Sequence, residues 1–237
     1  MKEEESREGA AFPSGLEQPE GSFRFSRDAL LLAEFAMESA LPERTSFADL
    51  GTGCGVVALA VLRRRPLWQG VGLEIQSALV EAAERNAVRL GVERRFSVVG
   101  GDVADAGCVR RLRACSGGDA SPDALPLFDA VLCNPPWRRE GAGRVPSSCM
   151  RRTALFGTEH TFPDFFSAAD RLLKPSAVLM AVSGAERTTD LLAALPRRLR
   201  PERLRFVFTR QSAPATFVLL EARKNGRGTL RVERMEC

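Results

Sequence analysis

The sequence predicts an α/β fold in which a largely parallel sheet is covered by helices on both faces. Two observations predict it. Short apolar segments alternate with longer segments of helical periodicity, and Gly-rich or polar motifs directly follow the first four apolar segments. Alternating strands and helices form parallel sheets, because each helix is the crossover between two strands. Ligands bind such sheets at the carboxyl ends of the strands, so the motifs also indicate where the functional site lies.

The expected elements follow this alternation. A helix is expected after Ser26, with Asp28 in its first turn, and Pro42 stops it, because Ser favours helix starts and Pro interrupts helices. The expected strands are residues 46–50, 71–75, 96–102, 128–134, 177–183, 203–209 and 215–222, the last two as an antiparallel pair. The other expected helices are residues 56–62, 77–90, 103–115, 163–173 and 186–195, with a long basic loop before 161.

Composition indicates one main domain between two tails. Residues 1–22 are rich in Glu, Gly, Pro and Ser and are expected to form a disordered acidic tail. Residues 23–45 are expected to be a lead-in helix or cap, 46–228 the main domain, and 229–237 a C-terminal tail.

The chain of 237 residues has 44% apolar and 27% charged residues, which is ordinary for a globular protein and excludes fibrous or wholly disordered classes. No apolar run reaches the ~18 residues of a membrane span, and the acidic start is no secretory signal. The six cysteines form no CxxC pair and there is one histidine, so we expect no metal site and a cytoplasmic location.

Charge is unevenly distributed. The whole chain carries +4, whereas residues 1–20 carry −4 and the remainder therefore +8. Almost all of the positive charge is arginine, which binds phosphate in a bidentate manner. A GC-rich genome would also produce arginine richness, so both interpretations stay open at this point.

A glycine-rich loop follows the first strand. Its candidate ligand-binding residues are Asp49, Gly51, Thr52, Gly53, Cys54 and Gly55. Glycine lets the backbone turn sharply and lets a ligand approach closely. The dinucleotide fingerprint GxGxxG is absent, since valine occupies position 56. The carboxylate of Asp49 would repel a pyrophosphate, but it suits a ligand with a cationic amine.

Two further acidic residues end the next two strands. Glu74 lies 23 residues beyond Gly51, a spacing that suits hydrogen bonds to ribose hydroxyls. Asp102 ends the third strand, where it is placed to meet an adenine amino group. Each of them alone could be an exposed strand-end charge, but three acidic strand ends together favour a nucleoside site.

Together these motifs resemble the class I S-adenosylmethionine (AdoMet) methyltransferases over about residues 44–222. The resemblance implies a Rossmann-like fold with a seven-stranded mixed sheet, and AdoMet as the cofactor. It implies that the glycine-rich loop wraps the methionine and ribose part, that Glu74 binds the ribose, and that Asp102 approaches the adenine. Asp28 is placed at the lid of this pocket, although it could equally be a helix cap.

The catalytic motif is expected after the fourth strand, at Asn134, Pro135, Pro136 and Trp137. An exocyclic or amide NH₂ is a poor nucleophile, because its lone pair is delocalised. The Asn134 side-chain oxygen and the Pro135 carbonyl can accept hydrogen bonds from the two N–H groups of the amine. These bonds aim the nitrogen lone pair at the methyl group of the cofactor. The prolines make the turn rigid, and Trp137 offers a face for stacking a planar substrate. The motif is similar to the [N/D]PP[Y/F/W] signature of amino-methyltransferases, whose targets are adenine N6, guanine N2, cytosine N4 or the glutamine amide.

The segment before the core favours one of these targets. Residues 23–32, FRFSRDALLL, are similar to the FxxDxxLLA lead-in of bacterial adenine-N6 methyltransferases of valine tRNA, and the likeness extends over about 22–228. Release-factor glutamine methyltransferases carry an additional helical domain, and the rRNA guanine enzymes usually have a duplicated domain. This chain is expected to be too short for either addition. Both remain alternatives, as does an AdoMet-binding module without catalysis.

An RNA substrate is also suggested by the loop after the motif. Its candidate RNA-binding residues are Arg138, Arg139, Arg144, Arg151 and Arg152, which give residues 138–152 a net charge of +4. Arginines beside the site would bind RNA phosphates. The expected partner is therefore RNA, with tRNA favoured, and the chain is expected to be a monomer or a homodimer. A solvated basic face is the alternative.

Overall fold

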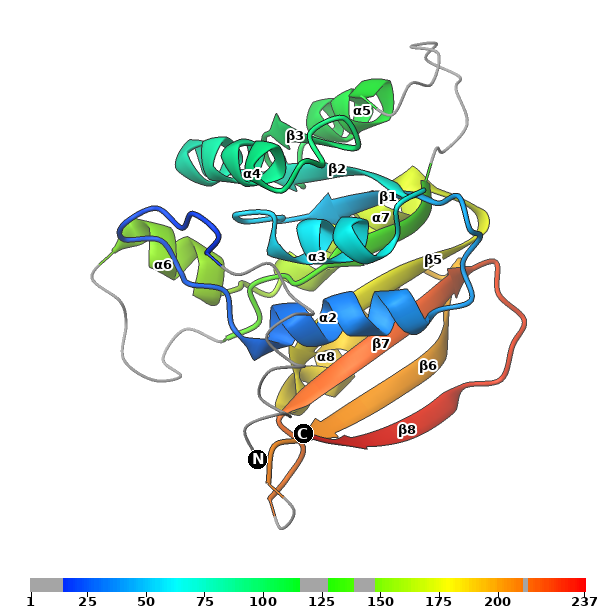
Figure 1. Cartoon of the computed structure of the whole chain (residues 1–237). Helices are drawn as coiled ribbons and strands as arrows, with labels where there is room; N and C mark the ends of the chain where they lie inside the picture. The colour runs from blue at the N-terminus through cyan, green and yellow to red at the C-terminus, as the bar shows by residue number, and fades with distance from the viewer. Residues whose placement is uncertain (1–14, 116–127, 139–147, 211–212) are drawn as a thin grey trace, which may run out of the picture.

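The computed structural model describes residues 15–115, 128–138, 148–210 and 213–237, and it contains one central eight-stranded sheet (Figure 1). The strand order is β3-β2-β1-β4-β5-β7-β6-β8. The strands are β1 (Ser46–Leu50), β2 (Gln69–Glu74), β3 (Phe96–Gly100), β4 (Phe128–Cys133), β5 (Leu173–Gly184), β6 (Leu199–Phe208), β7 (Phe217–Lys224) and β8 (Arg231–Glu236). The helices are α2 (Arg27–Glu38), α3 (Val56–Arg64), α4 (Ser77–Arg89), α5 (Ala106–Cys115), α6 (Cys149–Leu155), α7 (Thr161–Leu172) and α8 (Thr188–Ala193), with a short 3₁₀ turn, η1 (Ala185–Arg187).

Strands β1 to β5 are parallel, and β7 is antiparallel to both of its neighbours. The chain crosses from β3 back past β1 to β4, so the strand order reverses between β1 and β4. Leu50 is paired with Leu73 on one side and with Cys133 on the other, which aligns the carboxyl ends of three strands. This reversal is where open α/β sheets bind ligands.

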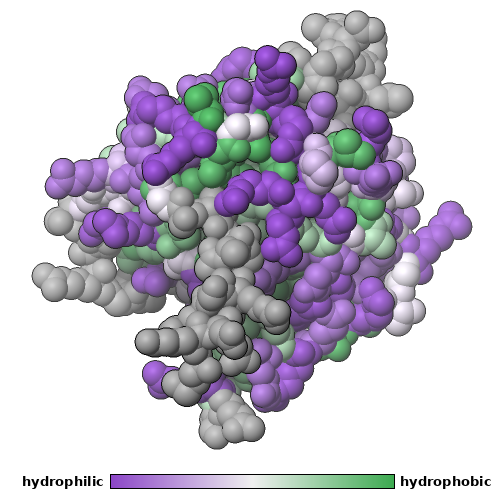
Figure 2. All heavy atoms as spheres, in the orientation of Figure 1, coloured by the Kyte–Doolittle hydropathy of each residue, from purple (hydrophilic) through white to green (hydrophobic). Residues whose placement is uncertain are grey.

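Helices cover both faces of the sheet, as the alternation predicts. One apolar core lies under α2, α3 and α4, and the other under α5, α7 and α8. Helix α3 is buried from Val56 to Leu62, which explains why its sequence is apolar all round. On the face of the molecule shown in Figure 2, hydrophilic side chains dominate and apolar ones show only in small patches.

The sheet has eight strands, so the expected number of seven is wrong. The additional strand, β8, lies within residues 229–237, which the sequence assigns to a tail, and it pairs in parallel with β6. Its side chains are half-buried or exposed, and Val232 is 65% exposed. The segment therefore lacks the apolar pattern that identifies a buried strand.

The two loops beside the expected site also contain order that the sequence did not indicate. Residues 148–156 include helix α6 inside the expected basic loop. Residues 15–22, assigned to the disordered tail, pack on α4, and Leu16 is buried there. Residues 1–14, the rest of that tail, and residues 116–127, between α5 and β4, lie outside the described residues. None of the helices in the described ranges combines the length and apolar character that a bilayer crossing requires.

Candidate active site

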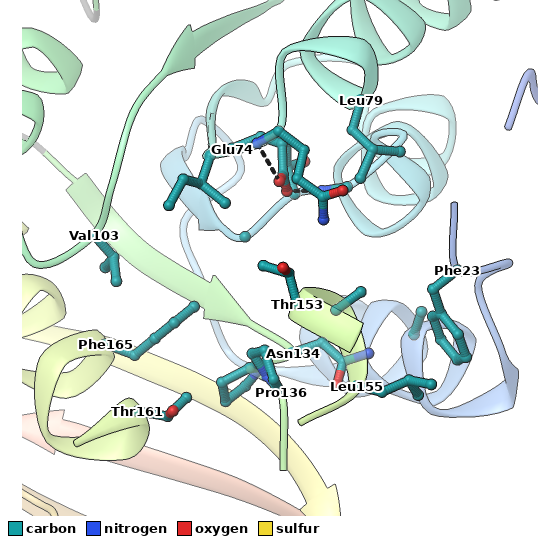
Figure 3. A pocket seen from close by; sticks show the side chains of 18 of the residues that line it. Phe23, Glu74, Leu79, Val103, Asn134, Pro136, Thr153, Leu155, Thr161 and Phe165 are labelled. Carbon is teal, nitrogen blue, oxygen red and sulfur yellow. Dashed lines mark hydrogen bonds between the residues drawn. The ribbon is translucent and has the colours of Figure 1, made fainter. Parts of the chain in front are cut away.

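A cavity of about 450 Å³ opens at the carboxyl ends of the strands, at the reversal of strand order (Figure 3). Most of the site residues expected from the sequence line it: Asp28, Asp49, Gly51, Thr52, Gly53, Cys54, Glu74, Asp102, Asn134, Pro135, Pro136, Trp137 and Arg138. Gly55 is not a lining residue; it is the N-cap of α3. The volume of the cavity is in the range of pockets that bind small ligands.

The glycine-rich loop is shaped by left-handed backbone at alternate positions. Gly51, Gly53 and Gly55 have φ angles of 70°, 59° and 87°. The N–H groups of Gly51 and Thr52 both donate to the carbonyl of Leu73, at 2.8 and 3.0 Å, which fixes the loop to β2. A Cβ atom on Gly53 would meet no heavy atom within 4 Å, so this position borders open space in the cavity.

Asp49 is 1% exposed and accepts a hydrogen bond from the Thr52 hydroxyl at 2.7 Å. Burial raises its pKa to about 7, since desolvation disfavours the charged form more than the Thr52 hydrogen bond favours it. A carboxylate in this state gains from a cationic partner, because a nearby positive charge favours ionisation.

Glu74 ties the glycine-rich loop to the end of β2. Its Oε2 accepts the N–H of Gly53 and its Oε1 the N–H of Gln76, both at 2.9 Å (Figure 3). Burial raises the pKa of Glu74, with these backbone hydrogen bonds opposing the shift. Each carboxylate oxygen can accept a second hydrogen bond, so the side chain can still bind ligand hydroxyls.

Two other acidic residues lie at the edges of the cavity. Asp102 is exposed and its Oδ1 accepts the N–H of Ala104 at 2.9 Å. Asp28 is 4% exposed, and its Oδ1 accepts hydrogen bonds from the Ser26 hydroxyl and the Ala29 N–H, at 2.5 and 2.9 Å. The N-cap residue of α2 is Ser26, so Asp28 lies in the first turn of the helix, where its side chain also lines the cavity.

The Asn134–Trp137 turn lies across the cavity from Glu74 (Figure 3), and the N–H of the next residue, Arg138, donates to the carbonyl of Leu155 at 3.1 Å. Within the described part of the chain, no hydrogen bond is found for the Asn134 side chain. The ring of Trp137 packs edge-on against Phe217, with 6.4 Å between ring centroids, and the guanidinium of Arg138 lies 5.5 Å from its centroid.

Further residues line the cavity that were not assigned to it from the sequence, among them Thr161, Asp164 and Phe165 of α7. Helix α6 and the residue after it contribute Thr153, Ala154, Leu155 and Phe156, and the lead-in segment contributes Phe23 and Phe25. The alternating aromatics at 23 and 25 are the one sequence signal for this wall. The two elements are joined by the Ser148 hydroxyl, which donates to the Gly21 carbonyl at 2.5 Å, and by Arg151 Nε, which donates to the Ser22 carbonyl at 3.0 Å.

The arginines assigned to RNA are divided by the structure. Arg138 is exposed at the cavity, whereas Arg151 and Arg152 are exposed on α6 without lining it. Arg139 and Arg144 lie outside the described residues. Three arginines in and directly before β6 are engaged within the fold: Arg198 pairs with Asp170, Arg205 with Glu38, and Arg203 is buried against Phe35.

The cysteines near the cavity are not activated. Burial raises the pKa of Cys54 to about 11 and also raises that of Cys133, so both thiols stay protonated at neutral pH. Among the residues that the structure describes, no three His, Cys, Asp or Glu side chains are grouped to hold a metal ion.

Comparison with known sequences finds methyltransferases. No protein-family model matches the chain. A tRNA1(Val) (adenine(37)-N6)-methyltransferase of Porphyromonas gingivalis is 28% identical over 82% of this chain and 72% of its own length. A release factor glutamine methyltransferase of Nitratidesulfovibrio vulgaris is 29% identical over 68% of this chain and 52% of its own length.

Solved structures agree in fold. A predicted O-methyltransferase from Agrobacterium tumefaciens has a TM-score of 0.64 at 22% identity, over 88% of this chain and 86% of its own. TrmN from Thermus thermophilus has a TM-score of 0.56 at 20% identity, over 83% of this chain and 48% of its own. The chain thus has the Rossmann-like class I methyltransferase fold, and its sequence is similar to those of tRNA1(Val) adenine-N6-methyltransferases.

Proposed function

We propose that this protein transfers a methyl group from AdoMet to the N6 amine of an adenine in tRNA. The observation that carries the proposal is a single cavity with two chemically different walls. One wall holds the buried carboxylates of Asp49 and Glu74, and the other holds the Asn134–Trp137 turn. The similarity to tRNA1(Val) adenine-N6-methyltransferases over 82% of the chain supports the choice of substrate.

The carboxylate wall fits AdoMet. Asp49 would bind the ammonium group, whose positive charge would offset the desolvation cost of the buried carboxylate. The remaining lone pairs of the Glu74 carboxylate would accept hydrogen bonds from the ribose hydroxyls. The open space at Gly53 admits a ligand against the backbone. AdoMet would supply a methyl group on a sulfonium, and the neutral thioether left after transfer is a good leaving group that needs no metal or acid assistance.

The turn fits a planar amine. The Asn134 oxygen and the Pro135 carbonyl would accept the two N–H bonds of the amine, which directs the nitrogen lone pair towards the methyl group. As the nitrogen–methyl bond forms, the methyl–sulfur bond would break with its electron pair staying on sulfur, so that S-adenosylhomocysteine is released and the nitrogen loses one proton to water. No described residue needs to act as a strong base, because orientation alone can supply several kcal/mol of barrier lowering, roughly 7–11 in favourable cases.

Trp137 and Arg138 support a nucleic acid substrate. The Trp137 ring lines the cavity and can stack on a base, a contact worth ~1–3 kcal/mol. The exposed Arg138 beside it can bind a phosphate. An adenine inside a folded RNA would have to leave its stack to reach this turn.

Glutamine methylation of a release factor is the second candidate, because relatives with that name match up to 71% of the chain, among them one from Shewanella oneidensis. The two are separated by supplying methyl-labelled AdoMet with unmodified tRNA or with release factor. We expect label in tRNA, recovered as N6-methyladenosine by nucleoside mass spectrometry. Label in protein alone would replace the proposal by the second candidate, and AdoMet binding without transfer to either would indicate a binding module.

The variant Asn134→Ala tests the amine-positioning role. We expect transfer to fall by at least a hundredfold, with AdoMet affinity within about twofold of the parent protein, because Asn134 lies on the substrate wall. Near-normal turnover of this variant would refute the role assigned to the side chain.

A further inference from the structure

A buried arginine contacts the backbone of the Asn134–Trp137 turn from behind. Arg187 ends the 3₁₀ turn η1 that follows β5, and it is 8% exposed. Its Nη1 donates to the carbonyl of Trp137, and its Nε donates to Oδ2 of Asp190 at 2.6 Å. Its guanidinium carbon lies 5.2 Å from the ring centroid of Phe162 in α7. Nothing in the sequence motifs points to this residue.

Burying a cation is costly unless it is paired and hydrogen-bonded. Asp190 supplies the charge partner. That ion pair does not require burial, because an arginine at the surface could bind the same carboxylate. The additional burial directs the guanidinium at one backbone carbonyl, that of Trp137. The buried position of Arg187 therefore places one of its N–H groups where it can hydrogen-bond to the turn.

The turn is constrained on its other sides by close packing. A Cβ on Gly157 would lie 2.2 Å from the Pro136 carbonyl oxygen, so that residue must be small. A Cβ on Gly184 would lie 2.7 Å from the Trp137 ring, which also packs edge-on against Phe217. These contacts restrict the Trp137 ring and the Pro136 peptide on those sides, and the Arg187 hydrogen bond holds the backbone of Trp137, from which the ring projects.

We propose that Arg187 is a positioning residue, which holds the Asn134–Trp137 turn in the shape that receives the substrate amine. The proposal rests on the proposed methyl transfer for its functional consequence, but not for the contact itself. Displacing reacting groups by about 1 Å can cost a hundredfold in rate. Loss of Arg187 should thus slow the chemical step and leave AdoMet binding intact, because Arg187 does not line the AdoMet wall.

Arginine and lysine differ in what they can do here. The guanidinium donates to Trp137 and Asp190 from two nitrogens at fixed angles, whereas a lysine has a single nitrogen on a flexible stem. Arg187→Lys preserves the charge but not both bonds. Arg198→Lys is the control, because Arg198 also binds an aspartate, Asp170, through Nε and Nη2, and within the described part of the chain it has no hydrogen bond to the turn.

The test measures single-turnover methyl transfer to tRNA, AdoMet affinity, and the fluorescence anisotropy of Trp137. The chain has two tryptophans, so Trp68→Phe in every protein leaves Trp137 as the sole fluorophore. For Arg187→Lys and Arg187→Met we expect transfer to fall about tenfold to a hundredfold, AdoMet affinity to change by less than about twofold, and Trp137 anisotropy to drop. Arg198→Lys should change none of the three.

Unchanged transfer and anisotropy in both Arg187 variants would overturn the proposal, and so would equal effects in Arg198→Lys. If the parent protein methylated neither tRNA nor release factor, the proposed function would fail, but the anisotropy would still report whether Arg187 holds the turn. If Arg187→Met failed to fold, the charged Arg187→Lys variant would decide.

Discussion

The side-chain amide of Asn86 pairs with the backbone of Glu17 as a neighbouring strand would. Its Oδ1 accepts the Glu17 N–H at 2.8 Å, and its Nδ2 donates to the Glu17 carbonyl at 3.0 Å. The same Nδ2 also donates to the carbonyl of Cys54, at 3.0 Å, in the glycine-rich loop. One buried amide on α4 thus connects residues 15–22 to the loop that lines the cavity.

Asn86→Ala should therefore loosen both segments. It removes three hydrogen bonds, one of them the buried bond to the Cys54 carbonyl, so we expect a loss of about 1–3 kcal/mol in the free energy of unfolding. AdoMet affinity should fall as well, because the Cys54 peptide loses its support. Urea unfolding and calorimetric titration measure the two effects. Glu84→Ala, an exposed change on the same helix, is the control, and equal behaviour of the two variants would contradict the role of Asn86.

AdoMet binding should depend on pH through Asp49, whose pKa burial raises to about 7. Only the ionised carboxylate attracts the ammonium group, so we expect affinity to fall as the pH drops below about 7. Above about 8 the ligand amine itself loses its charge, since an α-amino group has a pKa of roughly 7.7–8.0. Titration calorimetry from pH 5.5 to 9 should show strongest binding between these limits.

Asp49→Asn separates this effect from others. The amide oxygen can still accept the Thr52 hydrogen bond, but the group no longer titrates. We expect weaker binding at every pH and no loss on the acid side. Glu74→Gln is the companion variant, because burial raises the pKa of Glu74 too. An acid-side loss that persists in Asp49→Asn and disappears in Glu74→Gln would assign the titration to Glu74.

The fold and one half of the site could be predicted from sequence because their signals are local. Asp49 and Glu74 lie at the carboxyl ends of β1 and β2, and Asn134 directly follows β4. Parallel pairing brings these strand ends together whatever the loops do. Helix α6 and strand β8 escaped prediction because their stability comes from distant partners. Helix α6 is held by carbonyls of residues 21–22, and β8 by pairing with β6 and by Arg205, which binds Glu233.

Arg151 and Arg152 offer a direct test of what α6 does. The sequence assigns both to RNA, whereas the structure shows Arg151 Nε donating to the Ser22 carbonyl. We expect Arg151→Ala to speed AdoMet dissociation, because the lead-in segment carries Phe23 and Phe25 into the cavity wall. Arg152→Ala removes the same charge from the same helix and leaves the Arg151–Ser22 hydrogen bond in place, so it serves as the comparison. Stopped-flow dissociation and tRNA binding at two salt concentrations distinguish the roles; equal RNA losses with unchanged dissociation would support the sequence-based assignment.

Gly53 should control AdoMet binding more than stability. It has a φ of 59°, and a Cβ there would project into the cavity without meeting any protein atom within 4 Å. Gly53→Ala therefore costs only the strain of left-handed backbone, about 1–2 kcal/mol, while its methyl group occupies ligand space.

Gly91 provides a matched control, because its φ is 67°, a Cβ there also meets no heavy atom within 4 Å, and it lies after α4 away from the cavity lining. We expect both alanine variants to lose similar stability in urea, and Gly53→Ala alone to lose AdoMet affinity, by about tenfold or more. Equal affinities in the two variants would show that the ligand does not approach the backbone at Gly53.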